Sequence, residues 1–155
     1  MKFFSKLLLT LAVSILLISP AMADNTERDK KAEALLNQLM PALQTDDFEA
    51  SIKATMPLLH KSLLNDAGTD ITADLRRFSF KKAHDGSKGY ATPVKISRVR
   101  ETSTSAIGFG PTAEAGLVID YFIDKKEGNG GMPAPVKVFF PADGGEPKIS
   151  YLGSI

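Results

Sequence analysis

The chain has 155 residues, a formal net charge of +1 at pH 7 and no cysteine. The lack of thiols excludes disulfides, cysteine-ligated zinc, iron–sulfur clusters and thiol catalysis. The near-neutral charge gives no electrostatic case for nucleic acid or an anionic membrane as the partner.

The first 23 residues have the pattern of a secretory signal peptide. Lys2 and Lys6 precede an apolar run over residues 7–18, and Ala21-Met22-Ala23 supplies the small residues of a cleavage site. The run of roughly 12 residues is shorter than the ~20 needed to span a bilayer. We therefore expect removal of residues 1–23 and one domain over residues 24–155. A periplasmic location follows, with full export as the alternative.

The beginning of the mature chain predicts helices. Apolar residues from Ala32 to Leu43 recur at helical spacing behind the capping-box pattern Thr26-x-x-Asp29. Pro41 predicts a kink or an end to this helix just before it. The acidic start Thr45-Asp46-Asp47 predicts a second helix, which Pro57 interrupts.

After the helices, apolar and polar residues alternate, and this period of two predicts strands. Residues 77–81 alternate between polar and aromatic, and residues 84–89 have the composition of a turn. Further strands are predicted over residues 90–100, up to Phe109, and at 117–123, 136–140 and 149–151. Helices followed by an antiparallel meander predict an α+β fold with the helices packed on one face of a curved sheet.

Residues 117–123 and 136–140 show the clearest alternation, and pairing their apolar faces predicts a register. It places Tyr121 opposite Val138 and Ile123 opposite Val136. In that register Asp120 and Lys137 are diagonal neighbours on the other face of the sheet.

Two segments carry a resemblance to a known superfamily. The phrase Leu43-Gln44-Thr45-Asp46-Asp47-Phe48-Glu49-Ala50 and the terminal strand Pro141-Ala142-Asp143-Gly144-Gly145-Glu146-Pro147-Lys148-Ile149-Ser150-Tyr151-Leu152 resemble small exported domains of the NTF2-like (cystatin-like α+β) superfamily. The resemblance implies a sheet that curls around the helices into a cone, often with an apolar pocket. The superfamily includes enzymes, carriers and scaffolds, so the fold does not assign a function.

Few residues suggest catalysis or metal binding. His60 and His84 are the only histidines and no metal-ligand spacing surrounds them, so no metal or cofactor is expected. Ser79-x-x-Lys82 matches a hydrolase motif only formally. Asp120 is the one candidate base, because apolar neighbours on its strand would raise its pKa. The alternative is a cross-strand ion pair with Lys137.

Three functions remain open. The first, and the one we favour, is a non-catalytic periplasmic binding domain for a small apolar ligand. The second is a protein-interaction module, such as an inhibitor, an immunity-type protein or an envelope-assembly factor, which includes homodimerisation through the open sheet face. It would use the pliable loop Lys125–Pro135, whose apolar tip holds Met132, Pro133 and Pro135. The third is an isomerase- or hydrolase-like enzyme using Asp120. The expected lining of the apolar pocket is Phe48, Ile52, Leu59, Tyr90, Phe109, Tyr121 and Phe140.

Overall fold

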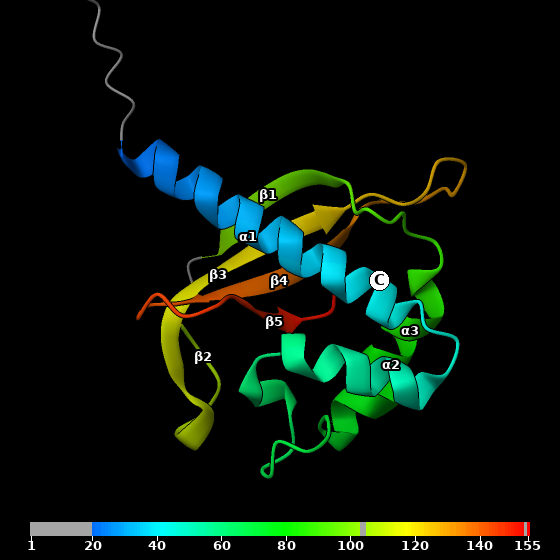
Figure 1. Ribbon diagram of the computed structural model, residues 1–155, viewed down its shortest axis with the longest axis horizontal. Coiled ribbons are helices and arrows are strands. Elements are labelled where there is room, and N and C mark those ends of the chain that lie inside the picture. The colour runs from blue at the N-terminus through cyan, green and yellow to red at the C-terminus, as the bar shows by residue number, and fades with distance from the viewer. Residues whose placement is uncertain (1–19, 103–104, 154) are drawn as a thin grey trace, which may run out of the picture.

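A computed structural model describes residues 20–102, 105–153 and 155, and most of the predicted signal peptide lies outside this part. The fold is α+β, as predicted, with the helical segments first and an antiparallel sheet after them (Figure 1). Helix α1 crosses one face of the sheet, and α2 and α3 gather at one end. No helix in the described ranges is both long and apolar enough to cross a membrane.

Helix α1 is longer than predicted at both ends. It runs from Pro20 to Leu43, so Thr26 lies inside it and does not start it, and the helix passes through Pro41. Pro41 stands in the last turn, where its missing N–H removes a single hydrogen bond. The Gln44 N–H still donates to the Met40 carbonyl oxygen at 3.0 Å. The buried residues of α1 are Ala32, Leu35, Leu36, Leu39, Met40 and Leu43.

Helix α2 begins as the sequence predicts, and it ends two residues before Pro57, which was predicted to interrupt it. It covers Phe48–Thr55, and the Asp47 carboxylate caps it by accepting the Ala50 N–H at 2.6 Å. Pro57 then lies in a short 3₁₀ turn, η1 (Met56–Leu58). A second such turn, η2, covers Lys61–Leu63.

The strand predicted around residues 77–81 and the turn predicted over residues 84–89 are both wrong. A π-helical segment, η3 (Leu75–Phe80), continues directly into helix α3 (Lys81–Ser87). Five alternating residues are too few to separate a strand from a helix. The buried residues at the end of this segment, Phe80, Ala83 and Ser87, have the spacing of a helix.

The predicted strands after residue 90 form one open sheet. They are β1 (Ile96–Thr102), β2 (Ala106–Ile107), β3 (Glu114–Ile123), β4 (Ala134–Pro141) and β5 (Lys148–Tyr151). Their order is β1-β3-β4-β5, and β2 also pairs with β3. A 3₁₀ turn, η4 (Gly110–Thr112), connects β2 to β3.

The predicted register of β3 and β4 is wrong by two residues. Tyr121 lies opposite Val136 and Ile123 opposite Ala134. The faces are nevertheless the predicted ones, because a shift of two keeps every side chain on its side of the sheet. Strand β4 begins two residues earlier than its apolar alternation indicates, and this moves the pairing.

The two faces of the sheet differ in character. The inner face packs with α1 in the core, and the buried Tyr121 hydroxyl donates to the Asp29 carboxylate at 2.7 Å. Burial is the main cause that raises the pKa of Tyr121. The outer face, which we define by Arg98, Arg100, Asp120, Phe122 and Lys137, lies on the opposite side. The inner-face residues of the central strands are Ile119, Tyr121, Ile123, Val136, Val138 and Ile149.

Candidate functional site

The residues predicted to line an apolar pocket do not surround a common cavity. Ile52, Leu59, Tyr90 and Tyr121 are buried in the core, each at most 3% exposed. Phe48 and Phe140 pack against that core from its edge. Phe109 is 92% exposed at the turn between β2 and β3. The interior uses most of these side chains for packing, and of the seven only Tyr90 also lines the surface groove described next.

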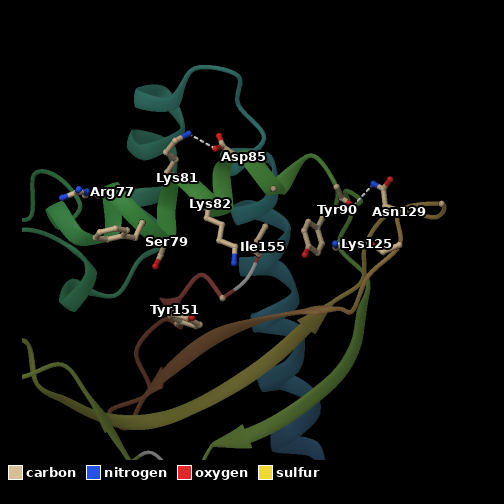
Figure 2. Close-up of a pocket in the computed structure, with 16 residues that line it drawn as sticks. Arg77, Ser79, Lys81, Lys82, Asp85, Tyr90, Lys125, Asn129, Tyr151 and Ile155 are labelled. Atoms are coloured by element: carbon tan, nitrogen blue, oxygen red, sulfur yellow. Dashed lines mark hydrogen bonds and ion pairs between the residues drawn. The ribbon is translucent and has the colours of Figure 1, made fainter.

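A groove at the surface lies between the η3–α3 segment and the loop that follows β3 (Figure 2). Its volume is about 1150 Å³, and Tyr151, Gly153 and Ile155 contribute one side. This volume is at the upper end of the range for small-molecule sites, roughly 300–1,000 Å³. The groove therefore has room for a ligand larger than a single small metabolite.

Four cationic side chains line the groove, and three of them lack an acidic partner. Lys81 forms an ion pair with Asp85 at 2.7 Å. No carboxylate in the described part of the chain lies within ion-pair distance of Arg77, Lys82 or Lys125. The side chains that line the groove consequently carry more positive than negative charge, although the whole chain is close to neutral.

Aromatic rings supply the apolar part of the groove. Phe78 is 60% exposed and Tyr151 is 43% exposed, which is unusual for rings of this size. Tyr90 is buried, and burial raises the pKa of its hydroxyl. The Tyr90 hydroxyl is therefore protonated at neutral pH. The groove combines positive charge with apolar surface.

The wall of the groove that contains Gly89 and Tyr90 is held by hydrogen bonds to the end of the core helix α1. The Gln44 amide donates to the carbonyl oxygens of Ser87 and Tyr90, both at 2.9 Å. The Lys126 N–H donates to the Gly89 carbonyl oxygen at 2.9 Å, and the Asn129 amide donates to it at 3.3 Å. These bonds join the loop after β3 to the segment after α3.

The predicted interaction loop Lys125–Pro135 contributes to the groove with only its first half. Lys125, Gly128, Asn129 and Gly130 line the groove. Met132 does not line it and is 86% exposed. Pro133 and Pro135 are half-buried and lie outside the lining.

Asp120 is held by two cations and does not face the groove. Its side chain is 1% exposed, and its Oδ2 accepts from Arg100 Nε at 3.0 Å and Nη2 at 2.5 Å. The Lys137 ammonium lies 3.2 Å from Oδ1. Burial acts to raise the pKa of this carboxyl, but hydrogen bonds and charges from Arg100 and Lys137 outweigh it and hold the pKa below its usual value. This favours the ion-pair interpretation over a general base.

The two histidines have structural partners. His60 is buried, and its Nδ1 accepts the Ser62 N–H at 3.1 Å, so Nε2 donates to the Glu114 carboxylate at 3.3 Å. Burial lowers the pKa of His60, and the bond to Glu114 opposes this shift only partly. His84 lies in α3, where its Nε2 donates to the Thr45 carbonyl oxygen at 2.9 Å.

The residues of the formal hydrolase motif, Ser79 and Lys82, do not contact each other through a hydrogen bond. Both line the groove on the helical segment. Within the described ranges no group of His, Asp and Glu side chains is placed to hold a metal ion.

Comparison with models of known families, with curated proteins and with solved structures finds no match to this chain. The NTF2-like resemblance thus rests on the sequence segments that suggested it.

The sequence analysis missed the groove because it assigned residues 77–81 to a strand. A signal was present: Arg-Arg-Phe-Ser-Phe-Lys-Lys over residues 76–82 places four cations around two phenylalanines. Such a cluster indicates an anion-binding surface whether it forms a helix or a strand.

Proposed function

We propose that the chain is a non-catalytic binding domain of the bacterial periplasm whose ligand occupies the groove. The ligand carries an anionic group and an apolar body. The observation that supports this proposal is the presence of three unpaired cations beside two exposed aromatic rings in one groove. The export part of the proposal rests on the signal-peptide pattern of residues 1–23.

The chemistry of the lining defines how binding would proceed. Arg77, Lys82 and Lys125 attract the anionic group, and the apolar body leaves water to pack against Phe78 and Tyr151. Each exposed charge contact adds on the order of 0.2–1 kcal/mol. The apolar contact adds about 25 cal/mol for each Å² removed from water.

Two fluorescent probes that share a naphthylamine body test this proposal. 8-Anilinonaphthalene-1-sulfonate carries a sulfonate, and N-phenyl-1-naphthylamine is its uncharged counterpart. We expect the sulfonate probe to bind more tightly, to weaken with added salt, and to lose about threefold in affinity in Lys82→Gln. The neutral probe should bind equally to both proteins.

Lys53→Gln is the matched control, because Lys53 is an exposed lysine of α2 that does not line the groove. Circular dichroism at near-ultraviolet wavelengths checks that each variant keeps its packing. Equal affinity of the two probes, or equal effects of Lys82→Gln and Lys53→Gln, would contradict the proposal.

A further inference from the structure

The outer face of the sheet carries a second cationic surface, separate from the groove. The register places Arg98 opposite Phe122, Arg100 opposite Asp120, and Asp120 opposite Lys137. Five side chains from three strands thus form one cluster. None of them lines the groove or any of four further cavities in the described ranges.

Asp120 neutralises only part of this charge. Its buried carboxylate binds Arg100 and Lys137, and both of these side chains reach solvent, at 63% and 35% exposure. Asp120 therefore holds the two cations in place across the strands, while their outward-facing N–H groups stay available.

Arg98 has no acidic partner among the residues that the structure describes. Its Cζ lies 3.7 Å from the centroid of the Phe122 ring, and the Arg100 Cζ lies 5.5 Å from the same ring. Arg98 is exposed, and no hydrogen bond or ion pair engages its guanidinium in the described part of the chain. A guanidinium stacked on a ring is already oriented and weakly hydrated, which favours bidentate binding of a carboxylate.

The shape of this surface favours a protein partner over a small ligand. Small ligands occupy concave sites, whereas this cluster lies on the face of a sheet outside the cavities described above. Exposed arginines are typical of the centre of a protein–protein interface, and here the buried Phe122 ring supports the guanidinium groups of Arg98 and Arg100 from below. Strand β1 is at the end of the strand order and its residues 97–101 are exposed, so Arg98 and Arg100 can be reached from solvent.

From this geometry we propose that the outer face binds an acidic segment of a partner protein, with a carboxylate in the plane of the Arg98 guanidinium. The interaction is independent of the ligand proposed for the groove. Two copies of this chain facing each other through this surface would bring Arg98 against like charge, so the surface disfavours self-association and selects an acidic partner.

Fluorescein-labelled octaglutamate is the probe, and octaglutamine is its uncharged control. We expect fluorescence anisotropy to show binding of octaglutamate only. Arg98→Gln should weaken it by about threefold, the size expected for one exposed charge pair. Arg98→Lys should weaken it as well, because lysine keeps the charge and loses the planar, stacked donors. Lys82→Gln, in the groove, should leave the affinity unchanged.

Two-dimensional NMR locates the bound peptide, and the largest shifts should fall on β1 and β3. Wild-type affinity in Arg98→Lys, shifts centred on the groove, or no binding of octaglutamate would each overturn the proposal. Tighter binding of an octamer of galacturonic acid, which carries the same number of carboxylates on a sugar backbone, would overturn the assignment to a protein partner. The naphthylamine probes of the groove report separately on the other site.

Discussion

Asp120→Asn is the substitution that most directly tests how the sheet is held together. Asparagine keeps the volume of the buried side chain and removes its charge. The acceptor of the Arg100 hydrogen bonds becomes an uncharged amide oxygen, although the guanidinium keeps its charge, and the new amide N–H₂ cannot accept from the Lys137 ammonium. A hydrogen bond to a charged group contributes about 1.5–3 kcal/mol. Because both cations are partly exposed, water screens their mutual repulsion.

We therefore expect Asp120→Asn to lower the free energy of unfolding by about 2 kcal/mol at pH 7. Urea unfolding followed by circular dichroism measures this value, with an unchanged dependence on urea concentration as the check on two-state behaviour. Asp124→Asn is the matched control. Asp124 lies 3.9 Å from a highly exposed Lys95, so its loss should change stability by less than about 0.5 kcal/mol.

The pH dependence of this difference has a defined sign. The folded-state pKa of Asp120 is lowered, so its contribution is fully present above the unfolded pKa and is lost as the pH falls through the folded pKa. The amide in the Asp120→Asn variant cannot titrate, so the gap between wild type and variant should shrink below about pH 4. Equal stability of the two proteins at pH 7, or a gap that stays constant into acid, would refute the reasoning.

Three further predictions concern single contacts, each measured by thermal or urea unfolding. Gly153→Ala should cost about 2–4 kcal/mol, because a Cβ there would overlap the Pro135 carbonyl oxygen of β4 and φ is +69°. Gly128→Ala, at a φ of +85° with open space around it, should cost only about 1 kcal/mol, and similar losses for the two variants would contradict this account. Tyr121→Phe should cost about 1 kcal/mol by removing the hydrogen bond to Asp29, and no loss would show that the bond does not stabilise α1. Asp47→Ala should cost about 1 kcal/mol through the lost cap of α2, whereas Asp47→Asn should retain most of the stability.

Much of the fold followed from the sequence because its local signals agree with its tertiary packing. The period of two across residues 117–123 and 136–140 identified β3 and β4 and their inner faces. Their register did not follow, because the alternation is the same at every shift of two residues. The length of the intervening loop decides between such registers, and the sequence pattern does not show where that loop ends.

The helical nature of residues 75–87 was hidden by a short alternation around Phe78. The π-helical segment also moves Leu75 and Phe80 to a spacing of five, which breaks the usual helical pattern at its start. Tertiary contacts decide the outcome here, since the Phe80 ring packs edge-on against Phe48 at 5.7 Å.

The candidate site was the hardest part to predict. Apolar side chains such as Tyr90 and Tyr121 were assigned to a pocket, and the structure uses them to fill the core. Composition does not distinguish a lined cavity from a packed interior, because that depends on how side-chain volumes fill the space between elements. By contrast, Asp120 and Lys137 were expected as a possible ion pair from strand faces alone, and the structure places them directly opposite each other.

The hydrogen bonds from Gln44 separate the shape of the groove from its charge. Many binding sites place both properties on the same residues. The amide of Gln44 fixes the backbone of the groove wall from the end of the core helix, while the charges that meet a ligand are carried by the flexible ends of Arg77, Lys82 and Lys125. Replacing one of these cations leaves the supporting hydrogen bonds intact. The charge preference of this surface can consequently change by single substitutions over many generations, while the shape of the groove and the stability of the domain stay nearly constant.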